Sequence, residues 1–328
     1  MAQKIDWWKQ SPNQLFLTKL KDRQCIPFVG PEVCKDWIPL SKPTAIRWAN
    51  KYHYPLPDKD RLSRVSQFLA ITYQDKNMPK EILSEELKQI KQPDFELGKF
   101  RDTPPVVLAD LNLPIYITTN YDHFIEEALR SRGKEPISDF CRWNEDLVDY
   151  AKENEINPTI YADQTNYEPT SAKPLVYHLY GDMNHPQSMV LTEKDYIDFI
   201  IFLNKEDEKK VLPHAIRKRL NSKKLLFVGY GLDEAGFSLD FSVIFQTVIN
   251  SRDKGNLKGV CVQLMMPSIN TNTNTNTNTN TDIEKYLEDY TKDLLNLSVY
   301  WGDSSTFSRE LRNQLDALPR TEMSDTEC

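Results

Sequence analysis

Two residues near the middle of the chain have the side chains and the spacing that bind a sugar or a water molecule. Asn120 and Asp122 follow the apolar run 113–117 and precede a helical pattern at 123–130. Ligands of open α/β sheets bind where the parallel strands end. The amide of Asn120 can donate to and accept from a hydroxyl group, and Asp122 can accept from a carboxamide. The alternative is that these side chains cap the following helix.

A second junction of the same kind carries a histidine. His178 lies near the end of the apolar run 174–179, two residues before Tyr180. On an extended strand that includes both positions, the two side chains point to the same face. A histidine there can act as a base near neutral pH. The alternative is a histidine whose hydrogen bonds are satisfied in the core or at a sheet edge.

Two further apolar runs end in glycine, one at Gly30 and one at Gly229, with Gly231 two residues later. Glycine permits a tight turn and the close approach of a ribose or a phosphate. After Gly30, however, Pro31 has no amide hydrogen to offer a phosphate, and the charge of Glu32 repels one. For the second pair of glycines, a plain turn between strand and loop is the alternative.

The elements that must position these residues alternate between strands and helices. Strands are expected at 26–29, 113–117, 174–179, 224–229, 259–265 and 296–301. Helices are expected at 11–21, 44–52, 60–73, 80–90, 195–203, 206–219, 240–249 and 304–318. This alternation predicts an α/β fold with a Rossmann-like, mostly parallel sheet and helices on both of its faces.

The length of 328 residues suits one domain with a smaller lobe. We expect the sheet-containing core at about 22–43, 112–133 and 173–318. A helical and loop-rich lobe is expected at about 44–111 and 134–172. The uninterrupted Asn/Thr alternation at 270–281 has no apolar side chain to bury, which predicts an exposed low-complexity loop.

Composition disfavours several classes of protein. The net charge of −7 argues against a general nucleic-acid surface. No apolar stretch approaches the roughly 20 residues of a membrane helix, and the first residues lack a signal-peptide pattern, so we expect a cytoplasmic protein with no membrane contact. The five cysteines include no Cys-x-x-Cys pair, which excludes a four-thiolate zinc site and leads us to expect no metal.

Taken in order, the junctions resemble the sirtuin superfamily, and most closely the bacterial sirtuin-like proteins of anti-phage defence. The segments that carry the resemblance are 27–30, 118–122, 178–181, 188–196, 229–233 and 300–302. The resemblance implies cleavage of the nicotinamide N-glycosidic bond of NAD⁺ within one sirtuin-like domain over 1–328. It implies catalytic roles for Asn120 and His178. It implies NAD⁺-binding roles for Gly30, Thr119, Asp122, Gly229, Gly231 and Trp301.

Three departures from the family pattern keep other functions open. The family's Gly-Ala-Gly loop is Gly30-Pro31-Glu32 here, its histidine directly before glycine is Tyr180, and its four-cysteine zinc module is absent. We therefore weigh an NAD⁺ hydrolase against a non-catalytic module that binds NAD or ADP-ribose and acts with a partner protein. An NAD-dependent protein deacylase is the third and weakest reading. Because no sensor domain is visible in the sequence, we expect a homo-oligomer or a sensor protein encoded by a neighbouring gene.

Overall fold

A single parallel sheet organises the structure. The computed structural model describes residues 7–161, 167–204, 212–220, 223–230, 259–264, 284–286, 288–289 and 297–317. Seven strands lie in the order β3-β4-β2-β1-β5-β6-β7, and each neighbouring pair is parallel. The strands are β1 (Cys25–Val29), β2 (Ile115–Thr118), β3 (Ile137–Phe140), β4 (Leu175–His178), β5 (Lys224–Val228), β6 (Gly259–Leu264) and β7 (Leu297–Trp301). The predicted α/β class is confirmed.

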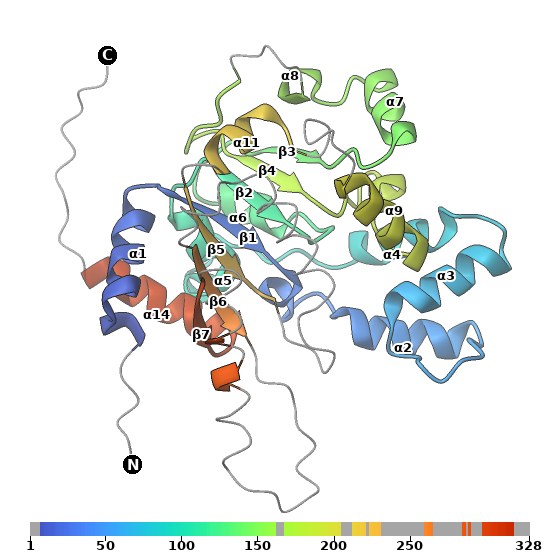
Figure 1. Cartoon of the computed structure of the whole chain (residues 1–328), viewed down its shortest axis with the longest axis horizontal. Coiled ribbons are helices and arrows are strands. Elements are labelled where there is room, and N and C mark those ends of the chain that lie inside the picture. Colours follow the sequence, from blue (N-terminus) through green and yellow to red (C-terminus); the bar gives the residue numbers. More distant parts are fainter. Residues whose placement is uncertain are drawn as a thin grey trace, which may run out of the picture.

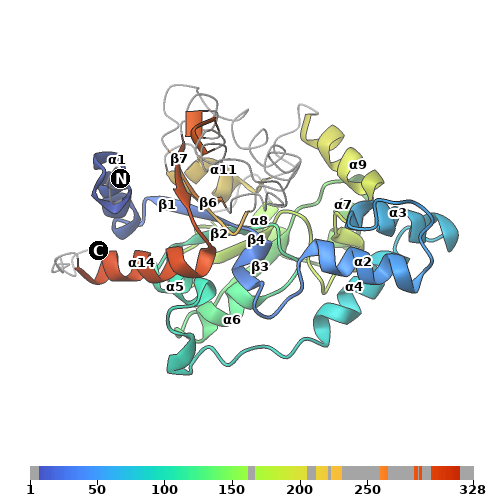
Figure 2. The same ribbon diagram turned by 90° about the horizontal axis from the view of Figure 1, so that it is seen from below.

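Helices cover both faces of the sheet and extend beyond one end of it (Figure 1). They are α1 (Ser11–Lys21), α2 (Ser41–Lys51), α3 (Leu62–Thr72), α4 (Met78–Lys88), α5 (Pro104–Asp110), α6 (Phe124–Arg130), α7 (Glu145–Glu153), α8 (Pro158–Tyr161), α9 (Glu193–Asn204), α11 (His214–Leu220) and α14 (Ser304–Ala317). Short 3-10 turns are η1 (Trp7–Lys9), η2 (Pro31–Cys34), η3 (Gly98–Phe100) and η4 (Pro186–Ser188). Figure 2 shows α5, α6 and α14 on one face of the sheet and α11 on the other.

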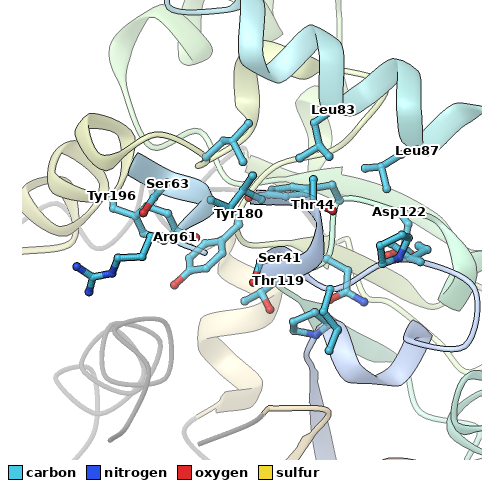
Figure 3. Close-up of a pocket in the computed structure, with 18 of the residues that line it drawn as sticks. Ser41, Thr44, Arg61, Ser63, Leu83, Leu87, Thr119, Asp122, Tyr180 and Tyr196 are labelled. Carbon is cyan, nitrogen blue, oxygen red and sulfur yellow. The ribbon is translucent and has the colours of Figure 1, made fainter. Parts of the chain in front are cut away.

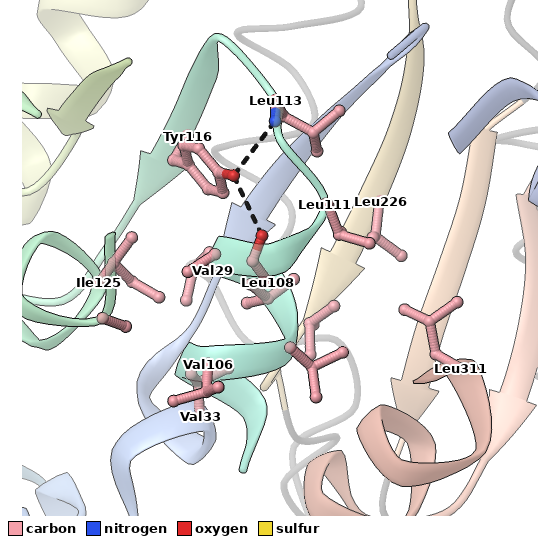
Figure 4. Close-up of a cluster of buried hydrophobic side chains, with 14 of the residues drawn as sticks. Val29, Val33, Val106, Leu108, Leu111, Leu113, Tyr116, Ile125, Leu226 and Leu311 are labelled. Carbon is pink, nitrogen blue, oxygen red and sulfur yellow. Dashed lines mark hydrogen bonds between the residues drawn. The ribbon is translucent and has the colours of Figure 1, made fainter. Parts of the chain in front are cut away.

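Alternation along the buried strands divides the core between the two faces. On β1, Ile26 and Phe28 pack in the cluster that contains Ile216 of α11. Their neighbour Val29 faces the opposite cluster, which is formed with α1, α5, α6 and α14. In that second cluster the hydroxyl of Tyr116 donates to the carbonyl of Leu108 at 3.0 Å (Figure 4). A buried phenol is thereby satisfied inside an apolar layer.

The connections change direction beside β1, and this places a crevice at the carboxyl end of the strand. From β1 the chain passes to β2 on one side, and β5 lies on the other side. At this crossing point Gly229 has a φ of +84°, and a Cβ on it would lie 2.7 Å from the carbonyl oxygen of Gly30. A Cβ on Gly30 would lie 2.5 Å from the carbonyl oxygen of Gly229. Glycine is therefore required at both positions for the two strand ends to approach.

The helices α2, α3 and α4 form a small cluster of their own beside the sheet. Trp48, Val65 and Leu69 are fully buried within it, and Met189 and Leu191 from the core join them. The buried ion pair between Lys80 Nζ and Asp195 Oδ1, at 2.9 Å, ties α4 to α9. This part of the chain is consequently fixed to the sheet-containing core. None of the described helices is long and apolar enough to cross a membrane.

One segment differs from the sequence prediction. Residues 134–172 were expected to be a loop-rich part of the lobe, yet 137–140 form the edge strand β3 of the main sheet. This strand is short, and its side chains alternate only weakly in polarity, so its pairing with β4 decides its conformation. The six strands that the sequence predicted begin and end within two residues of their positions in the structure. The expected helix at 240–249 and the loop at 270–281 lie outside the described residues.

Candidate functional site

A cavity of about 770 Å³ lies between the carboxyl ends of the central strands and the helices α2, α3, α4 and α9. Its core wall consists of Pro31, Thr119, Asn120, Tyr121, Asp122 and Tyr180. Figure 3 shows Tyr180 and Thr119 in the middle of the cavity, Asp122 towards one end, and Arg61 and Tyr196 towards the other. The cavity is therefore where a ligand of an open α/β sheet is expected to bind.

Asn120 belongs to this wall, and its side-chain oxygen is buried. Thr118 ends β2, and its hydroxyl accepts from the backbone amide of Asn120 at 3.0 Å. This bond turns the chain out of the strand. The side chain of Asn120 is 7 % exposed. Its Nδ2 lies 3.8 Å from the sulfur of Cys34, whereas its Oδ1 is buried without a hydrogen-bond partner among the described residues. Such an atom costs free energy unless a ligand or a water satisfies it.

Asp122, two residues further on, lines the cavity and bonds to the start of a helix. Its Oδ1 accepts from the backbone amide of Phe124, the first residue of α6, at 3.0 Å. Asp122 makes this Asx-type bond from the position before the N-cap residue His123, which makes no side-chain cap of its own. Burial raises the pKa of the Asp122 carboxyl group, and the nearby charge of Glu126 adds to the effect.

His178 lies behind the cavity rather than in its wall. The two junctions are adjacent, since Thr118 and His178 are paired across β2 and β4. However, β4 ends at His178 and the chain then turns, so Tyr180 lines the cavity while His178 is fully buried. The expected sharing of one face by the two residues is wrong because the strand does not extend through Tyr180.

The hydrogen bonds of His178 oppose its expected role as a base. Its Nδ1 lies 2.9 Å from the carbonyl oxygen of Asn120, and its Nε2 lies 2.8 Å from Glu126 Oε1. A carbonyl and a carboxylate only accept, so both ring nitrogens carry hydrogen. Burial alone would lower the pKa of His178, but the Glu126 carboxylate raises it to about 10. The sequence prediction is corrected in this respect: a charged, enclosed imidazolium holds the Asn120 turn in place.

A second histidine joins this buried network. His123 Nε2 lies 2.8 Å from Asp182 Oδ2, and the two histidine rings are 5.4 Å apart. Asp182 is buried, yet its bond to His123 and the charge of His178 lower its pKa to about 2. The ligand-type atoms of His123, Glu126 and His178 all lie within 4.8 Å of one another. Both nitrogens of His178 already donate, however, which leaves it no lone pair for a metal ion, and the expected lack of metal stays a prediction.

The loop at Gly30 offers few backbone donors to a phosphate. The amide of Gly30 donates to Val228, that of Glu32 donates to Gly229, and Pro31 has none. Gly30 and Gly229 contact each other closely and neither lines the described cavity. In the structure as described these glycines allow the two strand ends to meet, and their part in NAD⁺ binding stays a prediction. The side chain of Glu32 does not line the cavity either.

The remaining predicted binding residues divide into three groups. Thr119 lines the cavity, and its hydroxyl lies 3.4 Å from that of Tyr230. Trp301 ends β7, three strands away from β1, and its indole nitrogen donates to Glu288 at 2.6 Å. It is not part of the described cavity wall. Gly231 lies outside the described residues.

The charges that line the cavity are mostly negative. Asp60, Asp122 and Glu193 carry carboxylates, and Arg61 carries the one positive charge among the described lining residues. The aromatic ring of Tyr180 packs edge-on against Tyr196, with ring centres 5.7 Å apart. Such a wall suits a ligand with a cationic, planar part.

Sequence reasoning missed two residues of this site. Cys34 lies between Asn120 and Asp122, but an isolated cysteine gives no signal in a sequence. Glu126 lies in the first turn of α6 and pairs with His178. In the sequence it cannot be distinguished from any other acidic residue in a first helical turn. Only the packing of α6 beneath β4 reveals its partner.

Comparison with known proteins identifies the relatives of this chain. A family model described as a SIR2-like domain matches residues 114–292, more than half of the chain. The NAD(+) hydrolase ThsA of Bacillus cereus (strain MSX-D12) is 28 % identical over 158 residues, which are 48 % of this chain and 26 % of that protein. The NAD(+) hydrolase ThsA of Enterococcus faecium is 26 % identical over 128 residues, 39 % of this chain and 22 % of that protein.

These matches cover only part of each relative. The NAD(+) hydrolase ThsA of Cytobacillus dafuensis is 25 % identical over 130 residues, 39 % of this chain and 21 % of that protein. The chain thus spans about a quarter of the length of these curated relatives. A solved structure titled "Structural Basis for the Mechanism and Regulation of Sir2 Enzymes" covers 94 % of this chain and 98 % of its own, with a TM-score of 0.38 and 10 % identity.

Proposed function

Because the chain belongs to the SIR2-like domain family, we propose that it hydrolyses NAD⁺ at the bond between nicotinamide and ribose. The observation that carries the proposal is the group of polar side chains, Thr119, Asn120 and Asp122, that lines a 770 Å³ cavity where the central strands end. Such a group meets the need of a reaction in which a water or a ribose hydroxyl must be oriented. The partial similarity to three NAD(+) hydrolases supports the same reaction.

The reaction places modest demands on acid–base chemistry. The bond to the cationic nicotinamide ring breaks with its electron pair, so nicotinamide leaves as a neutral molecule without a general acid. A water forms the new bond to the ribose carbon and passes one proton to the solvent, which gives ADP-ribose. The main requirement is to stabilise a cationic, oxocarbenium-like centre. Asp122 supplies negative charge for this purpose in the wall of the cavity.

The other residues of the site act by position. Asn120 orients the water or a ribose hydroxyl from the cavity wall, and Thr119 lies beside it in that wall. The imidazolium of His178 donates to the carbonyl of Asn120 and so fixes the turn that presents this side chain. His178 is therefore proposed as a positioning residue. Tyr180, which follows β4 in the chain, lines the cavity in its stead.

The test is release of nicotinamide by the purified chain, followed by chromatography. We expect wild-type protein to convert NAD⁺ to nicotinamide and ADP-ribose. Asn120→Ala should lower turnover on the order of 10²- to 10³-fold, as expected for loss of a group that contacts the reacting atoms. Asn154→Ala is the matched control, because Asn154 is exposed beyond α7 and its side chain donates only to the carbonyl of Tyr150 among the described residues. Equal turnover in wild type and Asn120→Ala would refute the assignment.

A non-catalytic module that binds NAD or ADP-ribose is the second candidate function. It is favoured by the occupied amides of the Gly30 loop and by Tyr180 in the position of the family's histidine. Saturable binding of NAD⁺ measured by calorimetry, without any release of nicotinamide, would support this candidate over the first. A deacylase is disfavoured, because the five cysteines contain no pair close enough for a four-thiolate zinc module.

We propose further that NAD⁺ cleavage serves anti-phage defence and is gated by self-association or by a sensor protein. The resemblance to bacterial defence proteins motivates this role. Unrestrained loss of NAD⁺ would also harm the host cell, so an enzyme of this kind requires a resting state. The measurement is specific activity as a function of protein concentration.

A further inference from the structure

Two of the three carboxylates that line the cavity are offset by cations of the protein itself. Asp60 pairs with Lys42 at 3.2 Å, and Glu193 pairs with Arg64 at 2.7 Å. The third carboxylate belongs to Asp122, which is buried and forms no ion pair with a described residue. A positive charge on a ligand is therefore attracted most strongly to the Asp122 end of the described wall.

Arg61 is the positively charged counterpart at the other end of the cavity. It directly precedes α3 and is exposed, and its guanidinium forms no hydrogen bond or ion pair with a described residue. Ser63, two residues later, lines the same part of the chain with a hydroxyl group. Figure 3 shows Arg61 towards one end of the cavity and Asp122 towards the other. The described wall thus carries one unpaired charge of each sign, at opposite ends.

This arrangement is complementary to the charges of NAD⁺. The nicotinamide ring is cationic, whereas the diphosphate further along the molecule is anionic. A guanidinium donates paired hydrogen bonds to phosphate oxygens, and its charge strengthens them. The loop at Gly30 competes little for the diphosphate, because the amides of Gly30 and Glu32 donate to Val228 and Gly229 and Pro31 has none.

We propose that Arg61 binds the diphosphate of NAD⁺ and thereby makes the cavity selective for substrates that carry phosphate. The inference rests on the proposed function for its substrate. Because the diphosphate does not take part in bond breaking, its contact with Arg61 stabilises the bound substrate and the transition state equally. Such a contact lowers KM and leaves kcat unchanged. Arg61 is thus a specificity-determining residue of the cavity.

The kinetic test compares Arg61→Gln with Arg61→Lys and with the control Lys59→Gln. The control removes the same charge from an exposed position two residues earlier, outside the described cavity wall. We expect Arg61→Gln to raise KM for NAD⁺ at least about tenfold, with kcat within about threefold of wild type. Arg61→Lys should have an intermediate KM, because it keeps the charge but loses the planar pair of donors. Lys59→Gln should match wild type.

Nicotinamide riboside serves as the second substrate, because it contains the same scissile bond but no phosphate. We expect wild type and Arg61→Gln to cleave it with equal kcat/KM, so that the loss is specific to NAD⁺. An unchanged KM for NAD⁺ in Arg61→Gln, a loss confined to kcat, or an equal loss with nicotinamide riboside would overturn the inference.

A binding measurement does not depend on turnover. ADP-ribose contains the diphosphate without nicotinamide, and its Kd is measured by calorimetry at several salt concentrations. We expect Arg61→Gln to raise this Kd at least about tenfold and to weaken its dependence on salt, because salt screens the lost attraction. Equal Kd values in wild type and Arg61→Gln, or no binding of ADP-ribose by wild type, would overturn the inference. If wild type binds ADP-ribose but releases no nicotinamide, the proposed function fails, and this measurement alone decides the role of Arg61.

Discussion

Replacing Glu126 by glutamine should remove a dependence of stability on pH that the buried His178 creates. The two side chains are 2.8 Å apart and at most 1 % exposed. The pKa of His178 is about 10 in the folded protein, compared with its ordinary value of 6.5. Between these values the folded chain holds one proton more than the unfolded chain, so the free energy of unfolding falls as pH rises.

The size of the effect follows from linkage. One proton corresponds to about 1.4 kcal/mol per pH unit, so wild type should lose about 3 kcal/mol between pH 7.5 and 9.5 from this group. The stabilisation by His178 is complete below its ordinary pKa of 6.5 and is lost as pH rises through about 10. Without the carboxylate, burial lowers the pKa of His178 below its ordinary value, and its contribution to the slope disappears above neutral pH.

Urea denaturation followed by tryptophan fluorescence at pH 7.5, 8.5 and 9.5 measures this slope. Other groups titrate alike in both proteins, so the difference between wild type and Glu126→Gln isolates the pair. Glu127→Gln is the matched control, because the next residue on α6 pairs with Arg130 at the surface and should leave the slope unchanged. At pH 7.5 the loss of a buried partner should also cost about 3–5 kcal/mol. An identical slope in wild type and Glu126→Gln would refute the assignment of an imidazolium to His178.

Three further outcomes are expected. Gly229→Ala should destabilise the fold by about 1–3 kcal/mol, because φ is +84° and the new Cβ would contact Gly30 at 2.7 Å; an unchanged melting temperature would contradict this. Elemental analysis should find no zinc, since His178 has no lone pair to offer, and one zinc per chain would overturn the assignment. Specific activity should rise with protein concentration or on addition of a sensor protein; a constant value over a wide dilution series without any effect of a co-expressed neighbour would rule out the gate.

The sequence predicted most of the sheet and the place of the site. Apolar runs flanked by turn residues are a local signal, and six strands of the sheet were located from it to within two residues. The same local pattern placed Asn120 and Asp122 where a strand ends and a helix begins. The pairing of Thr118 with His178 shows that the two polar junctions are neighbours.

The edge strand β3 shows where local pattern stops being informative. Its four residues, Ile137–Phe140, contain a serine and an aspartate and lie in a segment interrupted by prolines. Asp139 is nevertheless buried, and burial raises its pKa to about 7. The pairing with β4 and the ion pair with Arg142 at 3.4 Å make this strand possible. Neither partner can be recognised from the strand itself.

Tertiary structure alone assigned the roles within the site. Asn120 and Asp122 have similar side chains at similar positions, yet Asp122 bonds to the first amide of α6, whereas the buried side-chain oxygen of Asn120 has no hydrogen-bond partner among the described residues. The charge of His178 is set by Glu126, 52 residues away, and the side-chain nitrogen of Asn120 donates to Cys34, 86 residues away. The physical reason is that strands and helices follow from the periodicity of neighbouring residues, whereas the state of a buried polar atom depends on which distant groups the fold brings within hydrogen-bonding range.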